Sequence, residues 1–197
     1  MEATCPGRGE GPDAIPIPPS DAMFDYPERQ IILRIRGAVD EKSRQYRSFV
    51  PKGLVGASDC FVVAVNGMRF PFIAEDANSP AILKAVMPVG APQLLVNRAT
   101  GEMRDGTFAY RPALSKRNGS DVATTCFLDP AYAHISAALF SEANFLMDAN
   151  SESANRYVTI VHNPLATNPL PPGWFGFGSE VVLSVDEEAV SWSLVNP

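Results

Sequence analysis

The segment ERQIILRIRGAVDEKSRQYRSFVPKGLVGASDCFVVAVN, residues 28–66, predicts a long helix that is followed by a buried strand. At about 100° per residue, the apolar side chains of residues 28–50 fall on one face, and Asp40, Arg44 and Arg47 fall on the opposite, solvated face. A third sector borders the apolar face and is expected to be half-buried; it holds Arg34, Ala38, Glu41, Lys42 and Gln45. Pro51 and Gly53 end the predicted helix. The six consecutive apolar residues at 60–65 are typical of a strand that is buried on both faces of a parallel sheet. A helix followed by such a strand suggests a crossover unit.

The remaining patterns add further strands, hairpins and one short helix. We predict a short helix at 79–87, strands at 122–128 and 157–161, a hairpin of 93–97 with 106–110, and a terminal hairpin of 180–185 with 190–195. Residues 134–140 fit either a strand or a helix. The predicted fold class is α/β or α+β, with a mixed central sheet, one main amphipathic helix and β-hairpins.

The length of 197 residues favours one domain. Five prolines precede Phe24, so we expect residues 1–27 to be an extended arm and residues 28–197 to be a single globular α/β domain. The net charge is −6, but residues 28–52 hold seven basic and three acidic side chains, a local net charge of +4. That local excess of positive charge fits an anion-binding face. It also fits the solvated face of an amphipathic helix.

Cysteine usage and hydropathy indicate a cytoplasmic protein. Cys60 and Cys126 adjoin apolar runs and are expected to be buried free thiols, which is typical of a reducing compartment. No apolar run reaches about 18 residues, and the N-terminus lacks the order of a signal peptide, so no membrane partner is expected. The sequence leaves the oligomeric state open.

A proline-rich stretch, RYVTIVHNPLATNPLPPGWF at residues 156–175, places His162 at the end of a predicted strand. His162 either bonds nearby backbone groups or acts as a base or a phosphate ligand. The aromatic residues Trp174, Phe175 and Phe177 form either an exposed stacking patch or a plug over the end of the sheet. The chain has no GxGxxG, Walker, GxSxG or HExxH motif, which weakens dinucleotide-binding and serine-hydrolase interpretations.

Six segments together resemble a known protein family. They are EATCPGRGEGPDAIP at 2–16, ILRIRGAVDEKSRQY at 32–46, FVVAVNG at 61–67, AILKAVMPVG at 81–90, ISAALFS at 135–141 and VHNPLATNPLP at 161–171. In this order they resemble an uncharacterised bacterial family of restriction-nuclease-like proteins whose core is similar to the PD-(D/E)XK nuclease fold. None of these segments is a highly specific motif, although the resemblance would extend over most of the chain.

The resemblance implies a metal site in which two carboxylates hold a divalent cation such as Mg²⁺ and a lysine orients the attacking water. Glu2 matches the second carboxylate and would be a metal ligand. Thr4 stands where the pattern has lysine, so Lys42 would substitute from the helix and Gln45 would complete a polar wall. The first carboxylate is expected tens of residues before Glu2, and the chain starts at Met1, so we expect an incomplete metal site.

The leading functional hypothesis is therefore a nuclease-like protein that associates with DNA or RNA. Its expected catalytic residues are Glu2, Lys42, Gln45 and His162, and Arg34 and Lys42 are expected to bind phosphate. Alternatively, Arg34, Lys42 and Gln45 are a helix edge whose long stems cover the core. The competing functional hypothesis is a non-catalytic assembly or partner-binding module, which fits the many prolines and hairpins.

Overall fold

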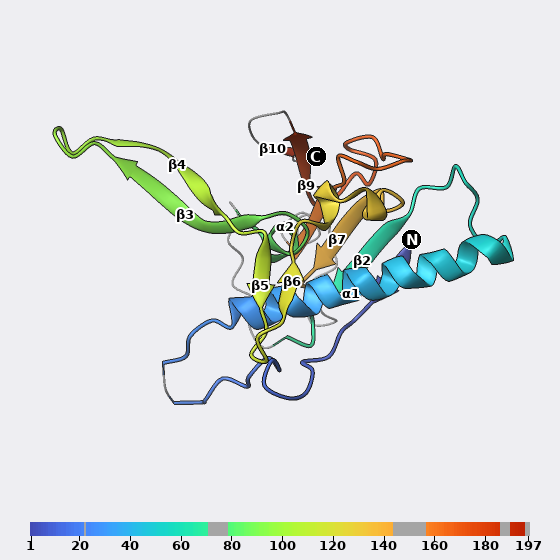
Figure 1. Cartoon of the computed structure of the whole chain (residues 1–197), viewed down its shortest axis with the longest axis horizontal. Coiled ribbons are helices and arrows are strands. Elements are labelled where there is room, and N and C mark those ends of the chain that lie inside the picture. Colours follow the sequence, from blue (N-terminus) through green and yellow to red (C-terminus); the bar gives the residue numbers. More distant parts are fainter. Residues whose placement is uncertain (22, 71–78, 144–156, 186–189, 196–197) are drawn as a thin grey trace.

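The computed structural model describes residues 1–21, 23–70, 79–143, 157–185 and 190–195. Its centre is a six-stranded mixed sheet in the order β1-β2-β7-β8-β9-β10 (Figure 1). The strands are β1 (Glu2–Thr4), β2 (Val62–Asn66), β7 (Ala137–Ser141), β8 (Val158–His162), β9 (Ser179–Val185) and β10 (Val190–Val195). Strands β1, β2 and β7 run parallel, whereas β8 is antiparallel to β7.

A crossover connects the first two strands through the main helix. The 22-residue helix α1 (Glu28–Phe49) lies between β1 and β2 in the sequence and packs across the sheet (Figure 1). It is followed by a 3₁₀ turn, Val50–Lys52, and by Gly53 in the left-handed conformation with φ 65°. The apolar stripe of α1 explains this position, because Ile31, Ile35 and Val39 are fully buried against the sheet.

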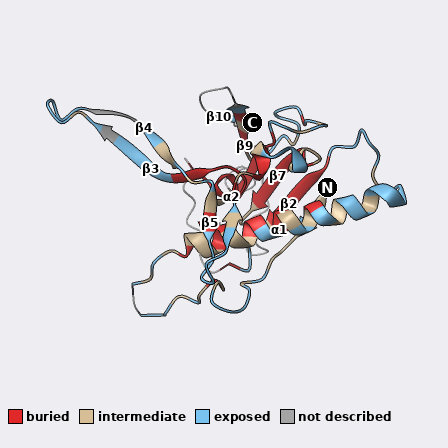
Figure 2. Ribbon diagram, in the orientation of Figure 1, coloured by how far each residue is buried: buried red, intermediate tan, exposed pale blue. Residues whose placement is uncertain are grey.

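The alternation of side chains along the strands divides the interior into two clusters. Val63 and Val65 of β2 belong to the large cluster on the α1 face. Val62 and Ala64 belong to a smaller cluster on the opposite face, together with Leu170. Figure 2 shows that the central strands are buried and that exposure rises toward the C-terminal end of α1. Strands that are apolar on both faces suit this arrangement, because both faces are covered.

Smaller elements are attached to this core. Helix α2 (Ala81–Val86) packs on α1, and β5 (Ala113–Ser115) pairs with β6 (Asp121–Ala123) beside it. Two short 3₁₀ turns, Cys126–Leu128 and Pro130–Tyr132, precede β7. The hairpin of β3 (Val89–Val96) and β4 (Met103–Tyr110) projects away from the body (Figure 1). Its base is held by Phe108, whose ring lies 5.0 Å from that of Trp192 in β10.

The predicted fold class is confirmed: the protein has a mixed sheet, one main helix and β-hairpins. Residues 134–140, which fitted two interpretations, contribute to strand β7. The predicted strand at 122–128 is mostly wrong, because a short strand ends at Ala123 and a 3₁₀ turn follows. In the described part of the chain, no helix is both long and apolar enough to cross a membrane.

Residues 1–27, which were expected to be an extended arm, begin with a strand of the central sheet. Glu2–Thr4 form hydrogen-bonded strand β1, and Ile15 is fully buried in the large core cluster. The Arg8 guanidinium donates to the Ile15 carbonyl at 2.7 Å and 2.9 Å, which holds the intervening loop closed. The described residues of 5–27 form no helix or strand, and the loop from Arg8 to Ile15 is nevertheless held on the body.

We predict that Ile35→Ala lowers the free energy of unfolding by roughly 2–5 kcal/mol, because it leaves a cavity under α1. Arg44→Ala on the exposed face should change it by less than about 0.5 kcal/mol. Urea denaturation followed by circular dichroism measures both values. Equal effects of the two substitutions would contradict the assigned faces of α1.

Candidate functional site

Three of the sequence-predicted site residues come together where α1 crosses the sheet edge. The ammonium Nζ of Lys42 donates to Gln45 Oε1 at 2.8 Å and lies 3.4 Å from Glu2 Oε2. The Lys42 side chain is 12% exposed and the Glu2 side chain 31% exposed, so both remain reachable from solvent. We call Glu2, Lys42 and Gln45 the edge cluster.

The strand register explains why Glu2 faces the helix. Glu2 lies opposite Val63, whose side chain belongs to the cluster on the α1 face. Thr4 lies opposite Val65 and takes the same face, because side chains two residues apart share a face. On α1, Lys42 and Gln45 lie three residues apart and therefore on neighbouring positions of one side.

Two hollows flank the edge cluster. One, of about 630 Å³, is lined by Glu2, Asp59, Cys60 and neighbouring residues. The other, of about 400 Å³, is lined by Thr4, Arg34 and several glycines. The edge cluster, with a hollow on either side, forms a polar seam between β1 and α1.

Asp59 is a seam residue that the sequence interpretation missed. Its Oδ2 accepts a hydrogen bond from the Gly56 N–H at 2.7 Å. The sequence could have indicated Asp59, because a carboxylate directly before a buried strand is a common way to present a functional group at a sheet edge.

Arg34 lies in the second hollow, in close contact with the loop that follows β1. Gly9 has φ 79°, and a Cβ there would come within 1.5 Å of Arg34 Nη2, so the guanidinium lies against the bare backbone. Arg34 forms no ion pair with any described residue. Its five N–H donors are therefore available to an anion in the hollow.

His162 does not join the edge cluster. Register places Glu2 level with Val63, Ala138 and Val161 on successive strands, so His162 is three strand spacings away, about 14 Å. Val161 faces α1, and His162 therefore points to the opposite face. Its Nε2 lies 2.8 Å from Glu180 Oε2, and that oxygen also accepts from the Gly173 N–H at 2.8 Å. Both side chains are buried, and they tie the proline-rich loop to the sheet.

The described residues do not fit a complete metal site. In the described ranges, no three or more His, Cys, Asp or Glu side chains are placed to hold one ion. Glu2 provides one carboxylate, but the Lys42 ammonium already lies 3.4 Å from its Oε2. A metal ion at Glu2 would compete with this ammonium. Mg²⁺ takes near-octahedral oxygen coordination, for which this arrangement provides too few ligands.

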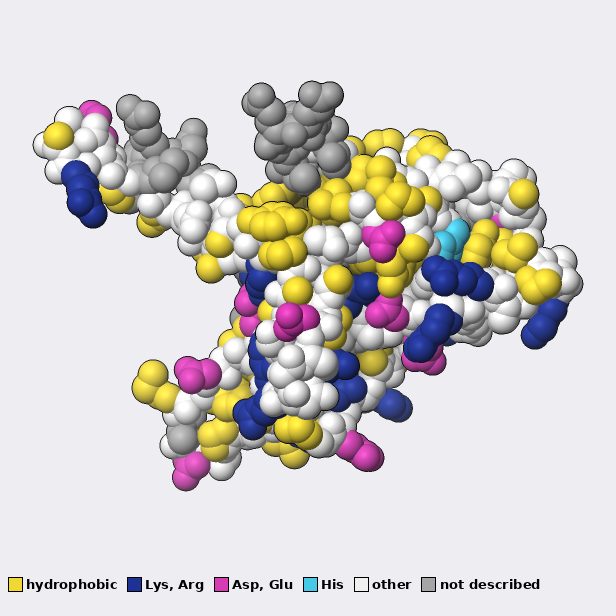
Figure 3. Space-filling model, viewed as in Figure 1, with side chains coloured by type: hydrophobic (Ala, Val, Ile, Leu, Met, Phe, Trp, Pro, Cys, Tyr) yellow, Lys and Arg dark blue, Asp and Glu magenta, His cyan; other side chains and the backbone are white. Residues whose placement is uncertain are grey.

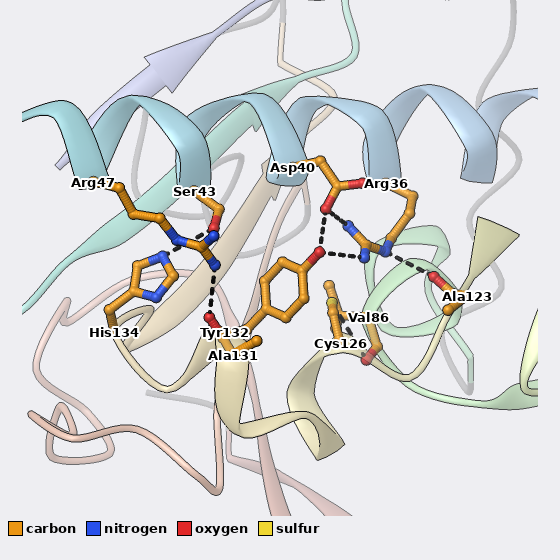
Figure 4. Close-up of polar contacts among 10 residues, drawn as sticks. All are labelled: Arg36, Asp40, Ser43, Arg47, Val86, Ala123, Cys126, Ala131, Tyr132 and His134. Atoms are coloured by element: carbon orange, nitrogen blue, oxygen red, sulfur yellow. Dashed lines mark hydrogen bonds and ion pairs between the residues drawn. The ribbon is translucent and has the colours of Figure 1, made fainter.

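A second polar network, buried beneath α1, is structural (Figure 4). Arg36 pairs with Asp40 and donates to the Ala123 carbonyl at 2.8 Å and to the Tyr132 hydroxyl at 2.9 Å. The Tyr132 hydroxyl donates to Asp40 Oδ1 at 2.5 Å. These bonds fix the 3₁₀ turn before β7 to the helix.

His134 lies beside this network and is half-buried. Its Nε2 lies 3.0 Å from Ser43 Oγ, and its ring stacks on Tyr46 with centroids 4.8 Å apart. Burial lowers the pKa of His134, and the nearby Arg47 charge lowers it further. A neutral imidazole packed against the helix is consistent with a structural role.

Comparisons with known proteins identify no relative. No family model, no curated protein and no solved structure matches the chain.

Glu180→Ala should lower the free energy of unfolding by roughly 1–3 kcal/mol, because His162 and the Gly173 N–H both lose a buried partner. Glu41→Ala, which removes an exposed carboxylate from α1, is the matched control and should change it by less than about 0.5 kcal/mol. Urea denaturation of both variants tests this. An unchanged midpoint for Glu180→Ala would contradict a role in holding the loop.

The two cysteines expected to be buried differ. Cys126 is buried and its Sγ contacts the Val86 carbonyl, whereas Cys60 is exposed at the start of the segment that leads into β2. Burial raises the pKa of Cys126 to about 12. Its thiol therefore stays protonated at pH 8 and reacts poorly, since the thiolate is the nucleophile.

We expect iodoacetamide at pH 8 to alkylate Cys60 in the folded protein and to leave Cys126 unmodified until urea is added. Peptide mapping by mass spectrometry distinguishes the two positions. Equal labelling of both in the native protein would show that Cys126 is accessible.

Proposed function

We propose that this protein is nuclease-like and associates with DNA or RNA through the polar seam between β1 and α1. The observation that carries the proposal is the edge cluster, in which Lys42 Nζ lies 3.4 Å from Glu2 and 2.8 Å from Gln45. A lysine beside a carboxylate at the edge of a mixed sheet suits a group that positions a phosphate or a water. The resemblance of the six segments between residues 2 and 171 to restriction-nuclease-like proteins supports the same interpretation.

The phosphate contacts would come from the helix side of the seam. Arg34 offers a planar fork of donors, and Lys42 offers a compact charge. Figure 3 shows basic and acidic side chains intermingled on the face that it displays, without one broad positive field. With a net charge of −6, the protein would attract a polyanion through a local contact, and the interaction should be salt-sensitive.

Cleavage would require Mg²⁺, for which Glu2 would supply one carboxylate. The described residues provide too few ligands for that ion. We therefore propose binding as the property of this chain and expect no cleavage by it alone.

The binding prediction compares two double variants that each remove two positive charges. Arg34→Ala with Lys42→Ala should weaken binding to a short DNA duplex and to single-stranded RNA. It should also reduce the slope of log affinity against log salt by about 2, one for each phosphate contact. Arg44→Ala with Arg98→Ala, the first on the exposed face of α1 and the second at the turn of the projecting β3–β4 hairpin, should leave affinity and slope nearly unchanged.

Fluorescence anisotropy at two salt concentrations, with and without Mg²⁺, measures these effects. Absence of binding at low salt would reject the nucleic-acid proposal. Equal losses in the two double variants would show that attraction depends on overall charge and not on the seam.

The alternative is a non-catalytic assembly or partner-binding module, and the projecting β3–β4 hairpin favours it. Leu94, Val96 and Tyr110 on this hairpin are 69%, 54% and 73% exposed. A two-stranded ribbon is marginally stable in isolation and gains from a third strand or a covering surface. Failure of the nucleic-acid experiment would make this alternative the leading one.

A further inference from the structure

A pocket of about 620 Å³ lies on the sheet face opposite α1. Its floor is formed by side chains of three adjacent strands: Val62 and Ala64 of β2, Leu139 of β7 and Val158 of β8. All four belong to the smaller core cluster and are at most 9% exposed. The floor is therefore part of the folded core and exists before any ligand arrives.

One wall of the pocket is aromatic. The ring of Phe175 lies 5.0 Å from that of Trp174 and 5.7 Å from that of Phe177, with both pairs edge-to-face. Such pairs favour one arrangement of the rings over others. The Trp174 side remains open, since this residue is 63% exposed. A ligand on the floor would cover an exposed indole.

The aromatic wall is attached at both ends. Before it, the Gly173 N–H donates to the buried Glu180, which also contacts His162. After it, Gly178 has φ 81°, and a Cβ there would lie 3.0 Å from the Val158 carbonyl oxygen, so the loop lies directly on β8. The buried His162–Glu180 pair thus fixes the position of the wall.

The chemistry of the lining selects for an apolar ligand. No charged side chain is among the lining residues, and the polar ones in this described set are Ser141 and Cys60. Ser141 Oγ already accepts a bond from the Ala143 N–H at 3.2 Å. An ionised group placed on the floor of the pocket would lose its hydration without gaining a counter-charge from any lining side chain, at a cost of several kcal/mol, on the order of the penalty for burying an unpaired ion.

The size of the pocket favours a small molecule over a protein. Eleven residues of the described ranges line it, whereas a stable protein interface uses about 20–30 residues on each side. The volume falls within the range of roughly 300–1,000 Å³ that is typical of small-molecule sites.

We infer that this pocket binds an uncharged, predominantly apolar small molecule that contains an aromatic or acyl group. The molecule lies on Val62, Ala64 and Leu139 and packs against Trp174. This inference is independent of the nucleic-acid proposal, because strand alternation puts the pocket and the edge cluster on opposite faces of the sheet.

The test uses N-phenyl-1-naphthylamine, an uncharged apolar dye whose fluorescence rises on burial, titrated into the full chain. We expect saturable binding of one dye per chain. Ala64→Phe, which fills the floor, and Trp174→Ala, which removes the open wall, should each weaken binding by roughly tenfold or more, equivalent to about 1.4 kcal/mol. Leu94→Ala removes an equally exposed apolar side chain from the distant hairpin and should leave the affinity within about twofold, a change of less than roughly 0.5 kcal/mol.

A second measurement uses the unmodified protein and so does not depend on the folding of any variant. Cys60 lines the pocket and is exposed, so saturating dye should slow its alkylation several-fold. Light scattering in parallel reports the oligomeric state. The inference is overturned by non-saturable binding, by equal affinity in Ala64→Phe, by unchanged Cys60 reactivity, or by a dimer that Trp174→Ala dissociates.

Discussion

The structure depends on the packing of one apolar stripe of α1 against the parallel strands β2 and β7. Ile31, Ile35 and Val39 are fully buried there, and they fix both the height and the rotation of the helix over the sheet. Once this rotation is fixed, every polar side chain of α1 has a defined direction. Residues next to the stripe on one side reach β1, and residues next to it on the other side reach the turns before β7.

These two flanks of the helix carry different chemistry for a geometric reason. On the β7 side, Arg36 is covered by the 3₁₀ turn, and each of its three nitrogens needs a partner, which Asp40, Tyr132 and the Ala123 carbonyl provide. On the β1 side, the helix overhangs β1, which is the edge strand of the sheet, so Lys42 and Gln45 keep access to solvent. Partial burial strengthens electrostatic interactions while leaving room for a ligand. The residues of the edge cluster, which are the candidates for function, lie on this β1 side of the helix.

The sequence predicts the main features where a periodic pattern is long. The helix of residues 28–50 follows from its helical period, the strand that contains Val62 follows from a continuous apolar run, and the terminal hairpin follows from two strand-like segments. The fold class follows from their order. The grouping of Glu2, Lys42 and Gln45 came from the resemblance, and the structure brings these residues together. Helical geometry also placed Lys42 and Gln45 as half-buried, whereas Glu41, assigned to the same sector, is exposed.

The features that were missed depend on contacts between distant segments. Asp40 was placed on the solvated face of the helix because its position on the helical wheel is far from the apolar stripe. In the structure, the turn that contains Tyr132 packs against Asp40, and no local sequence pattern reveals this contact. Strand β1 has three residues, too few for alternation to be visible, and it forms because β2 offers an edge. His162 was correctly placed at a strand end, but its partner Glu180 lies on the next strand, and the choice of face depends on a register that local sequence does not encode.

The alternation of the strands also separates the two candidate sites. Glu2 faces α1, and Met1, which directly precedes β1, lines both the hollow beside the edge cluster and the apolar pocket. Cys60 borders a hollow on each side in the same way. A ligand on the floor of the apolar pocket would contact β2, the strand that pairs with β1, without touching the edge cluster itself. Any coupling between the two sites would therefore have to pass through the positions of β1 and β2, which the packing of α1 holds in place.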